Sequence, residues 1–269
     1  MAFNKPLTVM QVITRLIEVL SLFNLCNRSY DGYVTEGASS VRRPKLANLN
    51  VKKNEGTAAG SGDRIGMKSG TTMVETELDV YAVPILSEIA GKFESNDKLR
   101  VEWIKSAVLA LQQQFDKDVI AAAQATTNIH QFAGDKMAWG DITKISAVFN
   151  QNKVPKDGRV VVVSANLEQE FWDIDAIKNA ASYNMQLLAS GKMVEVLGMK
   201  FFISGNVEKV NGKDNIVGFY GQGLAFILSK FGEIKEVYSP ELLADVIDML
   251  AHAGCELDSN EFAVVITTK

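Results

Sequence analysis

The chain has 269 residues, of which 47% are hydrophobic, so it can bury a core and is not a disordered polypeptide as a whole. Its formal net charge of -4 at pH 7 argues against a general nucleic-acid-binding protein, because such proteins carry a basic excess. Its two cysteines, Cys26 and Cys255, lie far apart in the sequence, which excludes a disulfide framework and a paired-cysteine metal motif and favours a reducing compartment.

Charge is distributed unevenly along the chain. Residues 1–70 hold ten Lys or Arg and five Asp or Glu, a net charge of +5, whereas the remaining residues hold eighteen and twenty-seven, a net charge of -9. Such asymmetry suits a basic arm that lies on an acidic partner, and it is an assembly signal where arm and acidic surface belong to different subunits. Two solvated regions with a chance bias explain the asymmetry equally well.

Residues 8–23 read as an amphipathic helix, with apolar residues at helical spacing and with Thr8 and Gln11 as a capping box. The apolar stripe predicts packing on the core or on a neighbouring subunit. A membrane surface is disfavoured, because the polar face is not rich in Lys and Arg. The segment lacks a signal-peptide cleavage site, and no run of about 18 uncharged apolar residues predicts a membrane span.

The next part of the chain predicts a protruding β-hairpin. Residues 54–70 hold five of the twenty glycines and almost no large apolar residue, which indicates a long flexible loop. Strict alternation follows and predicts a half-buried strand that Pro84 ends or places at a sheet edge. Loops of this length inside domains are usually functional. The face expected to be buried carries Val74, Thr76, Leu78, Val80 and Ala82.

The strongest helical signal spans residues 97–126, with Ser95, Asn96 or Asp97 as the N-cap. Thirty residues make a helix of roughly 45 Å, which suits the backbone element of an elongated domain. Its apolar stripe consists of Val101, Ile104, Val108, Leu111, Phe115, Val119 and Ala122.

Beyond Gly134 the pattern becomes mixed α/β. Asp141 is expected to cap a short helix with its apolar stripe at Ile142, Ile145, Val148 and Phe149, and residues 159–164 form an unbroken β-branched run typical of a strand buried on both faces. A helix with Leu167, Phe171 and Trp172 follows. Further strands are expected at 193–197, 200–204, 217–220, 224–228 and 262–267, while residues 241–252 fit a helix or a strand.

Residues 62–69 look like a phosphate-binding loop but fail in detail. Three residues rather than four separate the two glycines, and Met67 stands between Gly66 and Lys68. The following segment reads as a strand, whereas a phosphate loop leads into a helix. Nucleotide binding is therefore not expected.

Other candidate chemistry is weak. His130 and His252 lack a ligand at metal-motif spacing, and Asp173 with Asp175 could bind a cation but reads more simply as a solvated pair. Cys255 follows His252 by three residues, although a Cys–His dyad depends on spatial geometry that sequence does not supply. We expect no catalytic residue, no cofactor and no metal site.

Several stretches, in their order along the chain, resemble the HK97-like coat proteins of tailed bacteriophages. Residues 30–34 with Gly37 and the extended basic segment after them resemble the lead into the extended loop of that family. Residues 154–163, with Val-Pro followed by Gly-Arg and four valines, resemble the entry into the axial domain. Residues 193–206 resemble the paired strands near the end of that domain, and residues 253–266 resemble the closing segment, with Ser259 or Asn260 where proline is common.

The resemblance covers nearly the whole chain and implies an α+β, HK97-like capsid fold. The implied parts are an N-terminal arm (1–40), an extended β-hairpin loop (41–83), a peripheral domain with a long spine helix (84–138), a mixed α/β axial domain (139–222) and a return to the peripheral domain (223–269).

By this resemblance the chain is a structural major capsid protein and not an enzyme. It implies self-assembly into hexamers and pentamers of an icosahedral phage head around double-stranded DNA, in a virion assembled in the bacterial cytoplasm. Implied partners are a separate scaffolding protein, a portal and, where one exists, a decoration protein, with DNA contacted at most non-specifically and no membrane. Inter-subunit contacts are expected at the basic residues Arg42, Arg43, Lys52, Lys53, Arg64 and Lys68.

The family's covalent cross-link needs a loop Lys, an Asn and a catalytic Glu, and no matching context is evident, so cross-linking is not carried over. Three other readings stay open. An encapsulin, a nanocompartment of the same fold, would lie beside a gene for a cargo-loading peptide. An α/β enzyme would lose turnover on substitution of His252 or Cys255, and a lipid-binding module would sediment with liposomes.

Overall fold

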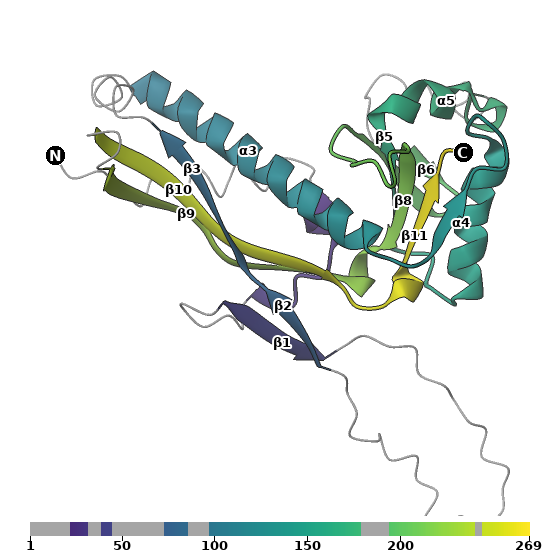
Figure 1. Cartoon of the computed structure of the whole chain (residues 1–269), viewed down its shortest axis with the longest axis horizontal. Coiled ribbons are helices and arrows are strands. Elements are labelled where there is room, and N and C mark those ends of the chain that lie inside the picture. Colours follow the sequence, from purple (N-terminus) through teal and green to yellow (C-terminus); the bar gives the residue numbers. More distant parts are fainter. Residues whose placement is uncertain (1–21, 32–38, 45–72, 86–96, 179–193, 240–243) are drawn as a thin grey trace, which may run out of the picture.

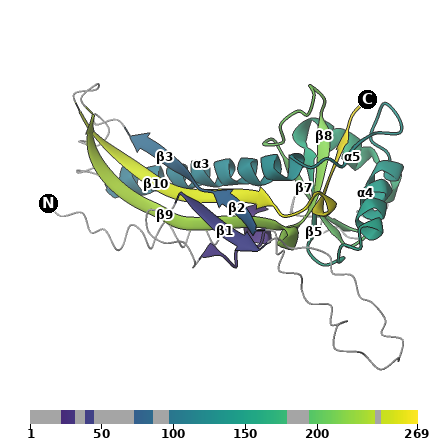
Figure 2. The ribbon, with the colours of Figure 1, turned by 60° about the horizontal axis from the view of Figure 1, so that its bottom comes forward.

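The computed structural model describes residues 22–31, 39–44, 73–85, 97–178, 194–239 and 244–269. An elongated part, in which one long helix lies along a three-stranded sheet, joins a second part built on a six-stranded sheet (Figure 1). A two-stranded hairpin projects from the elongated part near the junction, on the side of the long strands away from the helix (Figure 2).

The long helix is α3 (Asp97–Gln124), which confirms the helix expected over residues 97–126. Its described core side chains fall on one stripe, as the spacing predicts. The side chains of Val101 and Ile104 and the expected cap residues Ser95 and Asn96 lie outside the described residues. The buried stripe consists of Ala107, Val108, Leu111, Phe115, Val119, Ile120 and Ala123.

The three-stranded sheet under α3 is antiparallel, in the order β3 (Asp79–Ile85), β10 (Ala244–Leu257), β9 (Leu224–Ser239). The strand expected at 224–228 continues to Ser239, and the undecided segment 241–252 is strand where described. On β10, Met249, Ala251 and Ala253 point into the core that contains the α3 stripe.

The hairpin stem consists of β1 (Ser40–Pro44) and β2 (Met73–Glu77), paired antiparallel with Arg42 opposite Glu75. This confirms the stem of the expected hairpin, while the loop expected at 54–70 lies outside the described residues.

The predicted alternation after residue 73 is half right. Thr76 and Leu78 are buried as expected, but Val80 is 62% exposed, and Tyr81 and Val83 pack on the core instead. The reason is a change of partner, because β2 pairs with β1 whereas β3 pairs with β10, so the strand turns over after Leu78. Ala82 is likewise exposed. β3 is an edge strand and tolerates Pro84, as expected.

The six-stranded sheet has the order β4-β11-β8-β5-β7-β6. The strands expected at 159–164, 200–204 and 262–267 are confirmed, and all six residues of β5 are buried. The axial domain was expected to span residues 139–222, but two strands of this sheet lie outside that range. β4 belongs to the expected segment 84–138 and β11 to the expected segment 223–269. Its strands are β4 (Ile129–Gln131), β5 (Arg159–Ser164), β6 (Val194–Val196), β7 (Met199–Ser204), β8 (Asn215–Tyr220) and β11 (Ala263–Thr267).

Both faces of this sheet are covered. On β5, Val160 and Val162 join the core under α3, whereas Val161 and Val163 join a second core with α4 (Trp139–Gln151) and α5 (Glu168–Asp173). β8 and β11 alternate in the same way, so the two cores share three strands.

Asp141 supports the start of α4, but not as its N-cap residue, which is Ala138. The Asp141 carboxylate lies in the first turn and accepts hydrogen bonds from the backbone N–H groups of Ala133 (3.1 Å) and Ala138 (2.9 Å). Asp141 therefore reaches back from the third helical position, where a carboxylate also satisfies free donors. The apolar stripe expected on this helix is confirmed at Ile142, Ile145 and Phe149.

The helix expected at residues 8–23 lies almost wholly outside the described residues. Leu22 and Phe23 belong instead to a 3₁₀ turn, η1 (Leu22–Leu25), which packs against α3. The remaining short turns are η3 (Ala165–Leu167), η4 (Gly221–Gly223) and η5 (Asn260–Phe262).

Two neighbouring residues of α3 give a matched test of this packing. Val108 is buried, whereas Leu109 is 49% exposed. Val108→Asp would bury an unpaired carboxylate at a cost on the order of 4 kcal/mol, and we expect it to abolish soluble subunit. Leu109→Asp should change the thermal midpoint little. Equal melting of Val108→Asp and wild type in circular dichroism would show that the stripe does not face the core.

Candidate functional site

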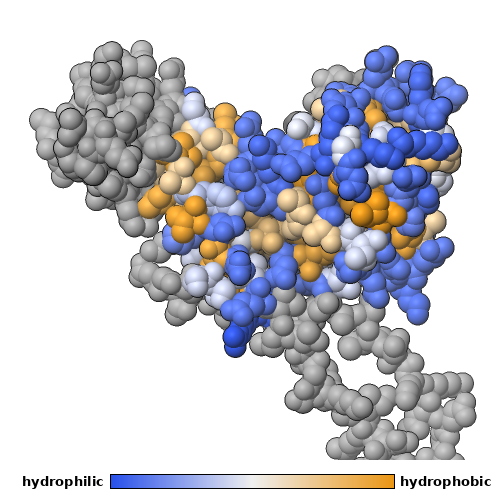
Figure 3. Space-filling view, in the orientation of Figure 1, coloured by the Kyte–Doolittle hydropathy of each residue, from blue (hydrophilic) through white to orange (hydrophobic). Residues whose placement is uncertain are grey.

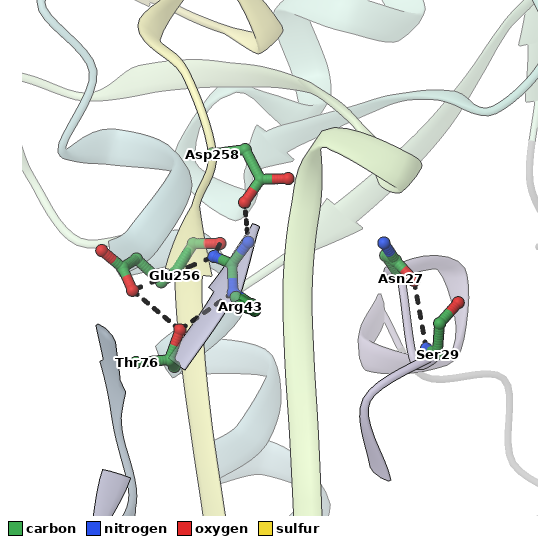
Figure 4. A network of polar contacts seen from close by, with 6 residues as sticks. All are labelled: Asn27, Ser29, Arg43, Thr76, Glu256 and Asp258. Carbon is green, nitrogen blue, oxygen red and sulfur yellow. Dashed lines mark hydrogen bonds and ion pairs between the residues drawn. The ribbon is translucent and has the colours of Figure 1, made fainter. Parts of the chain in front are cut away.

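The base of the hairpin holds a fully buried arginine. Arg43 lies on β1 opposite Val74, and its side chain points toward the end of β10 (Figure 4). Its guanidinium donates to the Thr76 hydroxyl (3.0 Å), to the Glu256 carbonyl oxygen (3.3 Å) and to the Asp258 carboxylate. The guanidinium carbon also lies 5.9 Å from the centre of the Tyr30 ring.

Charge is balanced within this network. The Asp258 carboxylate is buried beside Arg43, and the Glu256 carboxylate lies 3.9 Å from the guanidinium while accepting the Thr76 hydroxyl at 2.8 Å. Burial lowers the pKa of Arg43, and the Glu256 charge opposes that shift. A guanidinium keeps its proton in proteins, so the site is a permanent buried ion pair.

Arg42, the other half of the basic doublet, points outward. Its side chain is 74% exposed and lies 3.5 Å from the Glu75 carboxylate on the paired strand. Ser40 donates a hydrogen bond to Glu75 at 2.7 Å, and this bond together with the Arg42 charge lowers the pKa of Glu75. Successive residues of a strand face opposite sides, so one arginine ties the stem to the body and the other is displayed on its surface.

Residues 22–31 run along the outer edge of β9. Asn27 exchanges backbone hydrogen bonds with the start of that strand, donating to Leu224 (2.9 Å) and accepting from Phe226 (3.0 Å). The Asp31 carboxylate accepts the backbone N–H of Leu228 at 2.9 Å. This segment thereby satisfies part of a sheet edge that would otherwise be open to another chain.

The same segment is anchored to α3 by a carboxylate. Asp116 accepts the backbone N–H of Leu22 at 2.8 Å. Burial raises the pKa of Asp116 to about 6, against the hydrogen bonds from Leu22 and Phe23, which lower it.

An acidic hollow of about 440 Å³ lies between the hairpin base and α3. Tyr81 donates a hydrogen bond to Asp118 at 2.7 Å, and burial raises the pKa of both groups. The hollow presents negative charge beside the hairpin stem, and its acidic lining consists of Glu75, Glu77, Asp79, Asp118 and Glu256.

A second hollow of about 680 Å³ lies beside the start of α4 and the end of α5. Trp139, Glu170, Asp173 and Asp175 line it. Asp173 is held by Lys178 at 3.0 Å, so the expected Asp173–Asp175 pair is not a free carboxylate pair. In the described part of the chain, no three His, Cys, Asp or Glu side chains gather as a metal site would require.

His252 and Cys255 do not form a dyad. Ala251, Ala253 and Cys255 alternate into the core under α3, which turns His252 to the opposite face of β10. Burial raises the pKa of Cys255 well above its ordinary value, and that of the buried Cys26 as well. Burial thus disfavours the reactive thiolate form of both cysteines.

The predicted contact residues fall into three groups. Arg42 is exposed and available. The prediction of an inter-subunit contact is wrong for Arg43, because a side chain with no accessible surface cannot touch a second subunit. Lys52, Lys53, Arg64 and Lys68 lie outside the described residues. The Arg43 partners were missed, since Asp258 is 215 positions away and no local pattern links the two.

The surface of the described residues mixes apolar and hydrophilic side chains. Figure 3 shows apolar side chains in separate patches among hydrophilic ones on the face seen there, and the exposed large apolar residues include Val80, Leu109, Ile129, Trp139 and Leu197. Among the described helices, none has the length and apolar character needed to cross a membrane.

Comparison with known proteins gives matches only at the level of structure. No family model matches the sequence, and no curated protein does. A solved structure from Mycobacterium phage Che8 matches with a TM-score of 0.63 at 19% identity, covering 92% of this chain and 91% of that one. The capsid of cyanophage P-SCSP1u matches with a TM-score of 0.55 at 12% identity, over 92% and 88% of the two chains.

A virus-like particle from Pyrococcus furiosus matches with a TM-score of 0.58 at 10% identity, covering 96% of each chain. All these identities lie below 25%, so what the chain shares with these proteins is the fold. The shared fold extends over nearly the full length of each chain. One of the proteins that share it is the cyanophage capsid protein.

The Asp116 anchor predicts a dependence of stability on pH. Its pKa is higher in the folded chain than in an unfolded one, so the folded subunit holds this proton more tightly. The resulting stabilisation is complete below about pH 4 and is lost as the pH rises through about 6. Asp116→Asn keeps an acceptor for Leu22 but does not titrate. In urea unfolding, we expect the stability of wild type relative to this variant to fall from about pH 4.5 to about pH 7.5.

Parallel pH profiles for wild type and Asp116→Asn would contradict the assignment of a raised pKa to this anchor.

Proposed function

We propose that this chain, which has the fold of phage capsid proteins, is the major capsid protein of a tailed bacteriophage. It acts as a structural subunit, without catalysis of its own, that assembles into hexamers and pentamers of an icosahedral head around double-stranded DNA. The observation that carries the proposal is the extent of the shared fold, which spans 92% of this chain and 88% of a capsid chain from a cyanophage.

The projecting hairpin supports a role in assembly. A surface that reaches from one subunit onto a different surface of the next generates closed rings when the rotation closes. We assign the contact to Arg42 and to the loop residues Lys52, Lys53, Arg64 and Lys68. The positive charge of these residues in one subunit complements the acidic hollow beside the hairpin base of the next subunit. Such complementarity steers association and fixes the register between partners.

The parts of the chain take corresponding roles in this proposal. Residues 1–40 act as an N-terminal arm and 41–83 as the extended loop. The peripheral domain combines 84–138 with most of 223–269 and contains α3 and the long strands. The axial domain is built on 139–222, with β4 and β11 completing its sheet.

The proposed partners are further copies of the chain, a separate scaffolding protein, a portal and, in phages that have one, a decoration protein. DNA is contacted at most without sequence specificity, because the chain carries no basic excess. The protein is placed in the virion after assembly in the host cytoplasm.

A nanocompartment shell is the second candidate, because the same fold also builds a virus-like particle from Pyrococcus furiosus, which matches over 96% of each chain. The two differ in content, because a phage head encloses DNA and a nanocompartment encloses protein cargo. Nucleic acid in particles purified from the native source, protected from added nuclease, supports the phage head. Protein cargo in its place supports the nanocompartment.

Trypsin tests the proposed loop contact. Residues 54–70 are rich in glycine and poor in apolar anchors, so in free subunits we expect the first cuts within residues 52–68. A neighbouring subunit would offset the entropy of ordering this loop, so assembled particles should resist at the same bonds. Mass spectrometry of timed digests measures both, and equal cleavage in the two states would remove the contact from the account.

Deletion of residues 57–67 separates a contact loop from a passive one. The deletion removes no residue of the described cores, so the thermal midpoint of the subunit should stay close to that of wild type. Light scattering should then show loss or misdirection of particle assembly. Wild-type particles from the deleted chain would show that the loop is not needed for assembly.

A further inference from the structure

The hairpin stem has few main-chain ties to the body. β1 and β2 pair with each other as a separate two-stranded sheet. The backbone N–H of Leu78 donates to Ser39 at 2.9 Å, which again joins the hairpin to itself. The stem crosses β10 at Gly254, where a Cβ atom would overlap the Glu77 carbonyl, so a main-chain contact sets the distance there. The direction of the stem about this contact is left to side chains.

Two groups of side chains join the stem to the body: an apolar cluster of Val41 and Leu78 with Ile227 of β9, and the hydrogen-bonded group around Arg43. The Arg43 guanidinium donates to Thr76 on the stem itself, to the Glu256 carbonyl on β10, and to Asp258 just beyond the end of β10 (Figure 4). The Asp258 backbone N–H in turn donates to Gly223 at 3.0 Å, in the turn that leads into β9. The guanidinium therefore connects the stem to the place where the two sheets meet.

We propose that Arg43 is a positioning residue whose buried ion pair fixes the direction in which the hairpin leaves the body, and thereby the geometry with which subunits join. This inference rests on the proposed shell function. Asp258 is the matching acceptor, and Thr76 holds the guanidinium plane from the stem side.

Stability alone does not explain a charge at this place. Replacing a buried ion pair by apolar side chains of similar volume is often neutral or stabilising, because two desolvated charges cost nearly what their attraction returns. Apolar packing is non-directional, whereas a planar guanidinium with fixed donors holds its partners at set angles. Lysine keeps the charge but has no planar fork, so it can replace the attraction without the angles.

The direction of the stem matters for assembly because the segment with most of the proposed contact residues begins and ends there. The 28 residues between Pro44 and Met73 carry four of the five proposed contact cations, and both ends of this segment leave the body from the stem. A closed shell of hexamers and pentamers needs a small, defined set of rotations between neighbouring subunits. Variation of the stem angle would mix these rotations and spread the particle diameters.

Spin-label distances in free subunits test the positioning directly. Nitroxides at Glu75→Cys on the stem and Leu109→Cys on α3 occupy exposed positions, in a background of Cys26→Ala and Cys255→Ala. We expect Arg43→Lys and the apolar pair Arg43→Met/Asp258→Leu to broaden or shift the distance distribution. Arg42→Met, on the same stem but outward, should leave it unchanged. An unchanged distribution in both Arg43 variants would overturn the proposal.

Particle size tests the consequence. We expect subunits with Arg43→Met/Asp258→Leu to melt within a few degrees of wild type. In electron micrographs these subunits, and those with Arg43→Lys, should form particles of mixed diameter or none. Particles of Arg42→Met should keep one diameter. Particles of wild-type uniformity from both Arg43 variants would overturn the inference and leave the shell function intact. Absence of particles from wild type would instead overturn the shell function, with the spin-label result still deciding whether Arg43 positions the hairpin.

Discussion

Burial of three strands on both faces is the constraint on which the rest of the molecule depends. β5, β8 and β11 send alternate residues into the core under α3 and into the core with α4 and α5. Neither core can loosen without exposing strands that also form the other. The long helix and the six-stranded sheet are thus joined rigidly. The hairpin stem lies outside both cores and packs through Val41 against Ile227 of β9. Its attachment through the Arg43–Asp258 pair is directional, which suits a subunit that must meet its neighbours at a fixed angle.

Much of the fold could be predicted from local pattern. The spacing along α3 and the valine run of β5 each encode one period over many residues, and both were confirmed. Strand length and facing were less predictable. β9 continues to Ser239 and β3 turns Val80 outward because pairing partners far away in sequence decide them. The local pattern shows that every second residue is buried. Which of the two sets is buried after Leu78 depends on the change of partner strand from β1 to β10.

The candidate site was predictable only in outline. The basic doublet and the hairpin stem were visible in the sequence, but the separation of Arg42 and Arg43 to opposite faces required the register with β2. The acceptor Asp258 gave no local signal. Gln112 on α3 is a similar case: it is buried, and its amide atoms have no hydrogen-bond partner in the described part of the chain. From the sequence, a polar residue such as Gln112 is expected to be exposed. It is buried because other parts of the chain pack over it.

The central claim is that copies of this chain build a closed shell, and electron micrographs of the purified protein test it most directly. The account predicts closed icosahedral particles or five- and six-fold rings at neutral pH, alone or with a scaffolding protein. A protein that remains strictly monomeric at high concentration with scaffolding protein present would contradict the account.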